Sequence, residues 1–229
     1  MGKSKELAEL GQVVSQSGGN VGIGSSLPEE LLHLESAGVT GIKLDGAGDG
    51  AARISSSYGI INIEADVDSE NSASYIRFRN HGDEHMRIDA SGRVTMPYQP
   101  FFKARSQPNV NISVGGQTLP FDVVDTNIGG HYNGTTYTFT APVGGRYVFN
   151  VMLFTPPSTT SWDYFTVNGT RMTSIEQTDA PTNYTNRRDT FVAYLAAGDY
   201  VHMMHWSGTT HLNGTLAGPH SYFSGYLIG

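Results

Sequence analysis

The stretch TYTFTAPVGGRYVFNVMLF, residues 136–154, joins two strongly alternating segments through a Pro-x-Gly-Gly corner. Alternation of this kind is typical of half-buried β-strands. Pro142 cannot donate to a strand ladder, and Gly144 and Gly145 can take backbone angles that other residues avoid. We therefore predict two strands joined by a corner. The residues expected to face the core are Tyr137, Phe139 and Ala141 before the corner and Tyr147, Phe149, Val151 and Leu153 after it.

Residues 97–229 repeat such strand signals at short, regular intervals, which favours a two-sheet antiparallel sandwich of jelly-roll type. This part holds nine of the ten Phe, ten of the twelve Tyr and both Trp, so it can pack a core of its own. The whole chain has 28 Gly and no Cys, which favours an all-β protein with many turns and excludes disulfides and thiol chemistry. We expect the domain boundary near Pro97 and Pro100.

The N-terminal part has a different composition. Residues 1–16 place Leu7, Leu10 and Val14 on one helical stripe, which predicts a short trimerisation helix in a coiled coil or, alternatively, a frayed terminal helix. Residues 17–96 contain short alternating runs, for example residues 51–57 and 74–80. Each run has too few apolar residues to form a hydrophobic core within a single chain. We expect these strands to be stable when copies from several chains interlock.

Charge and hydropathy exclude several functions. The net charge is −7 and most of it lies in residues 1–96, with no basic stripe anywhere, so nucleic acid is not an expected partner. No apolar run is long enough for a membrane span, so no membrane insertion is expected. The first ten residues also lack the features of a signal peptide.

Two motifs of the N-terminal part resemble a module of bacteriophage tail fibres. They are GNVGIGSSLPEELLHL at residues 19–34 and MRIDASGRVTM at residues 86–96. In that module a Gly-Asn-Val-Gly-Ile-Gly opening is followed by a proline and a Leu-His pair, and the module closes on Arg-Ile-Asp-x-x-Gly. The resemblance covers both ends of residues 17–96, with a variable middle. It implies an interlocked, trimeric β shaft.

The C-terminal part resembles the heads of the complement C1q and tumour necrosis factor superfamily, and the matches follow in chain order. They are Phe101 to Arg105, Phe121 to Asn127 with His131 and Tyr132, Tyr137 to Phe149, Val167 to Gly169, Leu195 to Val201 and Phe223 to Ile228. The resemblance implies a C1q-like jelly-roll head that forms trimers. This chain departs from it in three ways: it lacks a cysteine after Phe139, a carboxylate in residues 207–221 where some members bind calcium, and a collagen-like repeat.

The sequence predicts no catalytic residues, no metal site and no cofactor. The acidic residues of the head form no recognisable pair for sugar cleavage, so we do not expect an enzyme. The histidines are interpreted as surface or interface residues, although three copies of one histidine on a threefold axis could hold a transition metal. The Asn-Gly-Thr triplets at Asn133, Asn168 and Asn213 are interpreted as turns, with glycosylation as the alternative.

Exposed aromatic and basic residues in the head's loops are the candidates for receptor binding, because recognition residues gather on loops carried by a rigid scaffold. Trp and Tyr stack on sugar rings, and Arg pairs with anionic groups. The candidates are Trp162, Tyr184, Arg187, Arg188 and His211. The alternative is that Trp162 and Trp206 lie in the core or in a subunit interface. This alternative is strongest for Trp206.

These observations predict a homotrimer that forms the distal part of a phage tail fibre. The protein would sit at the fibre tip and attach the virion to a host cell-surface glycan or protein. Its N-terminal side would join other tail proteins. The predicted domains are residues 1–16 as a helical stub, 17–96 as a shaft and 97–229 as the head. One alternative is a secreted C1q/TNF-like signalling or immune-recognition ligand, and a second is a tail-associated polysaccharide depolymerase.

Overall fold

A computed structural model describes residues 14–17, 20–23, 32–34, 40–45, 51–57, 60–65, 73–213 and 221–229 of the chain. These residues form strands, turns and loops and no helix, which confirms the predicted all-β class. The described residues accordingly include no helix that is long and apolar enough to cross a bilayer. The chain divides into two compact units, Met1–Met96 and Pro97–Gly229.

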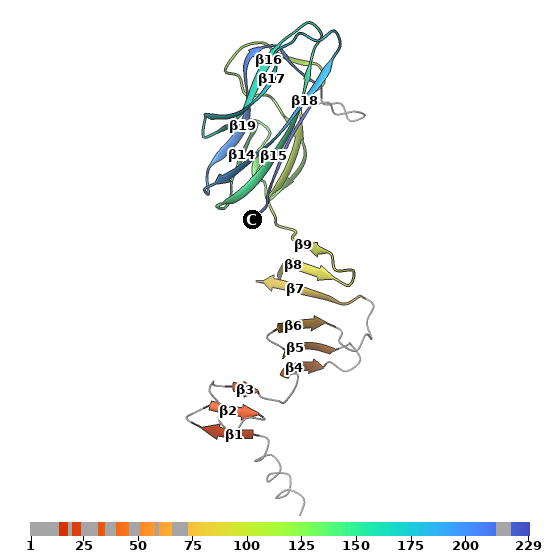
Figure 1. The fold of residues 1–229 in the computed structure, drawn as a ribbon, viewed down its shortest axis with the longest axis vertical. Helices are drawn as coiled ribbons and strands as arrows, with labels where there is room; N and C mark the ends of the chain where they lie inside the picture. Colours follow the sequence, from red (N-terminus) through yellow and green to blue (C-terminus); the bar gives the residue numbers. More distant parts are fainter. Residues whose placement is uncertain are drawn as a thin grey trace, which may run out of the picture. The chain divides into compact units, whose positions relative to one another are not determined.

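The described residues of the N-terminal unit form three three-stranded sheets (Figure 1). In the first sheet β2 pairs antiparallel with β1 and parallel with β3, whereas the other two sheets are antiparallel throughout. The strands are β1 (Val14–Ser17), β2 (Asn20–Ile23), β3 (Leu32–Leu34), β4 (Thr40–Asp45), β5 (Ala51–Ser57), β6 (Ile60–Ala65), β7 (Tyr75–Asn80), β8 (Asp83–Asp89) and β9 (Val94–Thr95).

The predicted N-terminal helix is not supported where the structure describes it. Residues 1–13 lie outside the described residues. The last three residues of the expected helix, Val14 to Gln16, belong to strand β1 and pair with Val21 to Ile23. Val14 therefore takes part in a strand ladder rather than in a helical stripe.

The middle sheet of this unit exposes an apolar row. Ile42, Ile54 and Ile63 are direct cross-strand partners on β4, β5 and β6, and their exposed fractions are 45%, 51% and 51%. Along β6, Asn62 and Glu64 alternate with Ile61 and Ile63. Because side chains alternate between the two faces of a strand, the isoleucines Ile42, Ile54 and Ile63 gather on one face of this sheet.

The C-terminal unit is a sandwich of a seven-stranded and a five-stranded sheet (Figure 1), which confirms the predicted jelly-roll head. The seven-stranded sheet runs β11-β20-β15-β21-β10-β12, with β18 also paired to β15, and the five-stranded sheet runs β13-β14-β19-β16-β17. The strands are β10 (Phe101–Arg105), β11 (Val110–Ile112), β12 (Val123–Ile128), β13 (Tyr132–Asn133), β14 (Thr138–Thr140), β15 (Gly145–Thr155), β16 (Ser161–Val167), β17 (Thr170–Gln177), β18 (Thr185–Leu195), β19 (Tyr200–Gly208), β20 (Thr210–Leu212) and β21 (Tyr222–Leu227).

The Pro-x-Gly-Gly corner carries the chain from one sheet to the other. Strand β14 belongs to the five-stranded sheet and β15 to the seven-stranded sheet, and the predicted core positions on β15 are all buried. Tyr137 departs from the prediction, since it precedes β14 and has a positive φ of 59°. At Gly145 the packing is close, since a Cβ there would lie 2.7 Å from Cδ1 of Leu227 and would displace that side chain.

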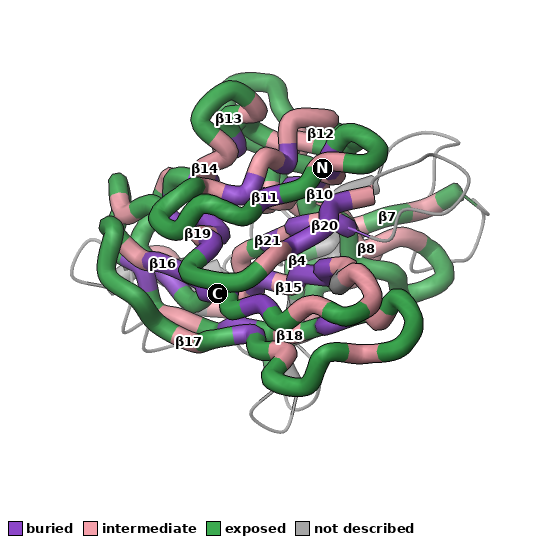
Figure 2. The backbone as a smooth tube through the Cα atoms, turned by 90° about the horizontal axis from the view of Figure 1, so that it is seen from above, coloured by how far each residue is buried: buried purple, intermediate pink, exposed green. Residues whose placement is uncertain are grey.

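Aromatic rings fill the space between the two sheets of the head. The ring of Phe102 stacks on Tyr132 at 4.5 Å between centroids, and it meets Phe223 edge-on at 4.9 Å. Gly225 leaves room for this cluster, since a Cβ there would lie 2.5 Å from the ring of Phe149. The buried segments of β15, β19 and β20, purple in Figure 2, belong to this interior.

The head's first and last residues lie together at one end of the sandwich. The backbone N–H of Leu227 donates to the carbonyl oxygen of Pro100 at 3.1 Å, and Gln99 Nε2 donates to the carbonyl oxygen of Leu227, also at 3.1 Å. Strand β15 starts at this end and finishes at the other, where the loops after β15 and β17 meet through the N–H of Ser158 and the carbonyl oxygen of Pro181. We call this second end the tip.

The turn between β16 and β17 confirms that one Asn-Gly-Thr triplet is a hairpin turn. Asn168 and Gly169 both have positive φ, 50° and 78°, as a two-residue turn of type I′ requires. Gly169→Ala should lower the free energy of unfolding by about 1–2 kcal/mol, because an L-residue is strained in the left-handed region. Urea denaturation at one protein concentration measures this. Gly144→Ala is the control, since Gly144 lacks a positive φ, and an equal loss there would contradict the explanation.

Candidate recognition site

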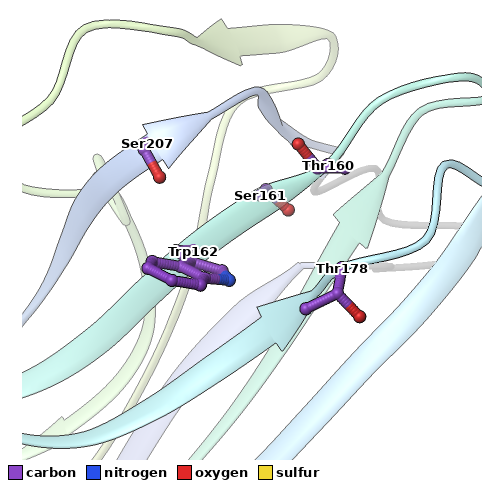
Figure 3. Close-up of a pocket in the computed structure, with 5 residues that line it drawn as sticks. All are labelled: Thr160, Ser161, Trp162, Thr178 and Ser207. Carbon is purple, nitrogen blue, oxygen red and sulfur yellow. The ribbon is translucent and has the colours of Figure 1, made fainter.

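The tip carries a hollow of about 250 Å³ on the five-stranded sheet (Figure 3). It is lined by Thr160 and Ser161 where β16 begins, by Trp162 on β16, by Thr178 just after β17 and by Ser207 near the end of β19. The indole of Trp162 is 41% exposed and lies between Ser207 and Thr178 in Figure 3. One aromatic platform is thus flanked by three exposed hydroxyl groups, those of Thr160, Thr178 and Ser207.

An irregularity of strand pairing shapes this hollow. Trp162 pairs with Ser207 and Asp163 pairs with His205, so Trp206 is an extra residue on β19 without a partner on β16. Such a bulge bends a strand and redirects its side chains. Gly208 follows with a φ of +80°, and a Cβ there would lie 2.0 Å from the carbonyl oxygen of Thr160. Only glycine lets this turn approach Thr160 so closely.

The chemistry of the hollow is polar and uncharged. The five residues that line it carry no ionisable group. Thr160, Thr178 and Ser207 are exposed, and a hydroxyl can both donate and accept, so these three groups are available to a ligand. Ser161 precedes Trp162 in the strand, so its buried side chain faces the interior.

A second aromatic group lies on the same sheet and is already covered by an arginine. The guanidinium carbon of Arg171 lies 3.4 Å from the centroid of the Trp206 ring and 4.9 Å from that of Tyr164. Trp206 remains 42% exposed, so it lies at the surface of this chain rather than in its core. Burial raises the pKa of Tyr164, which keeps its phenol protonated.

Arg187 lies inside the sandwich, which corrects its prediction as a receptor contact. Its Nη2 lies 2.7 Å from Asp163 Oδ2 and its Nη1 donates to the carbonyl oxygen of Ile175 at 2.8 Å. Asp163 also accepts a hydrogen bond from Thr210 Oγ1 at 2.6 Å and contacts His205 Nδ1 at 2.8 Å. Arg187 is only 5% exposed, so this network joins the two sheets and leaves no guanidinium for a receptor.

The other candidates lie in different places. Tyr184 is exposed and stacks on Phe154, with ring centroids 4.7 Å apart. His211 is buried beneath them, which lowers its pKa, and its Nδ1 contacts Asn111 Oδ1 at 2.6 Å, so its prediction as a surface contact is also corrected. Arg188 is exposed on β18, opposite Met152 in the seven-stranded sheet. The structure therefore does not gather the five candidates into one site.

Sequence reasoning missed the hydroxyl residues of the hollow: Thr160, Ser161, Thr178 and Ser207. Serine and threonine are common in loops and strands, and no spacing distinguishes these four in the sequence. Gly208 directly after Ser207 was the available signal for an unusual turn. In the described part of the chain, no group of three or more His, Asp and Glu residues could hold a metal ion.

Comparison with known proteins identifies the family of the head. The C1q domain family matches residues 101–228, more than half of the chain. Similar solved structures include the globular domain of a zebrafish complement 1qA protein (15% identity, TM-score 0.46), an Eiger TNF from S. frugiperda (17%, 0.40) and murine APRIL (12%, 0.44). Each covers 57% of this chain, and the alignments span 98%, 94% and 99% of those chains. On the match over residues 101–228, the chain belongs to the C1q domain family.

Proposed function

We propose that this chain is a homotrimeric attachment protein in which the C1q-type head binds a cell-surface receptor and residues 17–96 form a three-chain shaft. In its most specific form, the proposal makes the chain the distal part of a bacteriophage tail fibre. It would sit at the tip of the fibre and join other tail proteins through its N-terminal side. The head alone is equally consistent with a secreted C1q/TNF-like ligand.

The observation that carries the fibre proposal is the uncovered apolar face of the middle sheet in the N-terminal unit. Three aligned isoleucines, Ile42, Ile54 and Ile63, are each about half exposed in a single chain. A three-stranded sheet needs something packed on its apolar face to be stable in water. Two further copies of the same sheet would supply matching apolar faces, and three is the copy number that both sequence resemblances imply.

The head has an uncovered apolar face that fits the same proposal. On the outer side of the seven-stranded sheet, Val148 on β15 pairs with Val192 on β18 and with Tyr226 on β21. Val192 is 56% exposed, and the neighbouring Tyr194 is 72% exposed. An apolar band of this kind on a protein surface favours burial against another subunit.

Val192→Asp should weaken subunit association at least tenfold, about 1.4 kcal/mol, because each copy would bury an unpaired carboxylate. Light scattering measures the effect. The parent should have three times the 24.7 kDa chain mass, and the variant should shift toward a single chain on dilution. Met172→Asp on β17 is the control, because Met172 is also apolar and is about as exposed as Val192, but lies on the five-stranded sheet. A parent of 24.7 kDa would contradict the homotrimer, and an unshifted Val192→Asp variant would contradict this interface.

Attachment is tested with the labelled full chain on panels of bacterial and animal cells. Saturable binding to particular bacteria supports the tail-fibre proposal, and binding to animal cells alone supports the secreted-ligand alternative. Removing surface glycans from the cells that bind separates glycan from protein receptors. A fall in the viscosity of the host polysaccharide during incubation would favour the depolymerase alternative.

A further inference from the structure

We propose that the hollow lined by Trp162 binds one uncharged pyranose ring of a surface glycan. The proposal rests on the recognition function proposed for the head and names the chemical class that the head recognises. Three features carry it: an exposed aromatic side chain on a fixed backbone, a rim of exposed hydroxyl groups and the absence of charge on the five lining residues.

The platform is held by the sheet itself. Trp162 lies in the ladder between β17 and β19, with Glu176 and Ser207 as its strand partners. Its backbone is therefore fixed on both sides, while 41% of the residue remains open to solvent. A pyranose ring has an apolar face of C–H groups, which stacks on an indole, and a polar rim of hydroxyls. A backbone that is already fixed adds little ordering cost when the sugar binds.

The rim suits the sugar's hydroxyls. Thr160, Thr178 and Ser207 are exposed beside Trp162, and each offers a hydroxyl that donates and accepts, as a sugar hydroxyl does. Ser161 borders the hollow through its backbone, because it precedes Trp162 in the strand and its buried side chain faces the interior.

Charge decides which sugars fit. A sugar with a carboxylate or phosphate would lose water around its charge and find no cation among the lining residues. The exposed Glu176 lies beside Trp162 on β17, and its negative charge disfavours an anionic ligand further. Arg171, the nearby cation, stacks on the rings of Trp206 and Tyr164. Neutral hexoses and N-acetylhexosamines are therefore the expected class.

The size and place of the hollow indicate one ring of a longer chain. Its volume of about 250 Å³ lies just below the range of roughly 300–1,000 Å³ typical of small-molecule pockets. It lies at the tip, at the opposite end of the sandwich from Pro100 and Leu227. A shallow single-ring site binds with a dissociation constant on the order of millimolar, and three copies on one particle would combine through avidity.

The test uses the full-length protein and a panel of methyl glycosides: glucoside, galactoside, mannoside, N-acetylglucosaminide, N-acetylgalactosaminide and the anionic glucuronide. Saturation-transfer NMR and titration of tryptophan fluorescence report binding. At least one neutral glycoside should bind in the millimolar range, and the glucuronide should bind at least tenfold more weakly. Trp162→Ala should weaken binding at least tenfold. Trp206→Ala, which removes the other exposed indole, should change the dissociation constant by no more than about twofold. A tenfold change in this constant corresponds to about 1.4 kcal/mol.

A second variant separates a binding role from a structural one. Thr178→Val removes an exposed hydroxyl of the rim and keeps the shape of the side chain, so it should weaken glycoside binding several-fold without lowering the melting temperature. Failure of every neutral glycoside to bind, equal binding of the glucuronide, or full binding by Trp162→Ala would overturn the proposal. If Trp162→Ala still attaches to cells, the receptor site lies elsewhere and the proposed function stands. If the parent attaches to no cells, the proposed function itself fails.

Discussion

Replacing Asp163 by Ala should cost about 3–5 kcal/mol of the free energy of unfolding. Asp163 is fully buried and holds Arg187, His205 and Thr210 together at the junction of the two sheets. Without the carboxylate, the guanidinium of Arg187 would lose this ion pair while remaining buried. Breaking a buried ion pair from one side is far more costly than the pair's net contribution, because the remaining charge is desolvated and unpaired. Urea denaturation at a fixed protein concentration measures the loss.

Two further variants test this explanation. Asp125→Ala removes a carboxylate that pairs with Arg105 at 2.9 Å near the surface, where solvent weakens such pairs, and should cost at most about 1 kcal/mol. The double variant Asp163→Ala with Arg187→Met removes both charges from the core and should recover much of the lost stability. If Asp163→Ala costs no more than Asp125→Ala, or if the double variant is less stable than the single one, the buried-charge explanation is wrong.

Phe102→Ala should destabilise the head by about 3–5 kcal/mol, the usual cost of emptying a large aromatic site in a core. Phe102 is fully buried and contacts rings from both sheets: Tyr132 and Phe139 on one side, and Phe149 and Phe223 on the other. Four strands surround this position, so the cavity cannot close by moving a single loop. Thermal and urea unfolding should both report the loss.

The matched control removes an aromatic ring at the surface. Tyr184 stacks on Phe154 but is half exposed, so Tyr184→Ala should cost only about 0.5–1.5 kcal/mol. Phe102→Leu, which keeps most of the volume, should fall between the two. Equal losses for Phe102→Ala and Tyr184→Ala would mean that Phe102 is not the centre of the core.

Strand positions were predictable because alternation is a local signal. The runs at residues 51–57 and 74–80 correspond closely to β5 and β7, and residues 146–154 lie within β15. The short strands β11 and β20 were missed, since three residues are too few to show alternation. Their pairing depends on a register between Asn111 and His211, which are distant in sequence.

The candidate site was only partly predictable, because it too depends on pairings between residues that are distant in sequence. Trp162 was named from the sequence as a Trp beside a loop, and it is exposed and lines the hollow, while its role as a receptor contact stays a prediction. Arg187 was assigned to the surface, although it shares its strand face with Phe191 and Leu195, which are buried. This alternation along β18 indicates that Arg187 faces the interior. A guanidinium can be buried there because it pairs with Asp163, which lies on another strand. Pairings between distant residues arise from the fold and leave no local pattern.

The meeting of the head's two ends has a practical consequence for measuring binding. The carbonyl oxygen of Gly229 accepts a hydrogen bond from the N–H of Arg146 at 2.7 Å, so the last residue is held against the start of β15. A biotin or fluorophore attached after Gly229 emerges beside Pro100 and leaves Trp162 unobstructed. On a biosensor chip, such C-terminal capture orients every molecule with its sugar-binding hollow toward the flowing sample, whereas coupling through residues 178–184 would mask it.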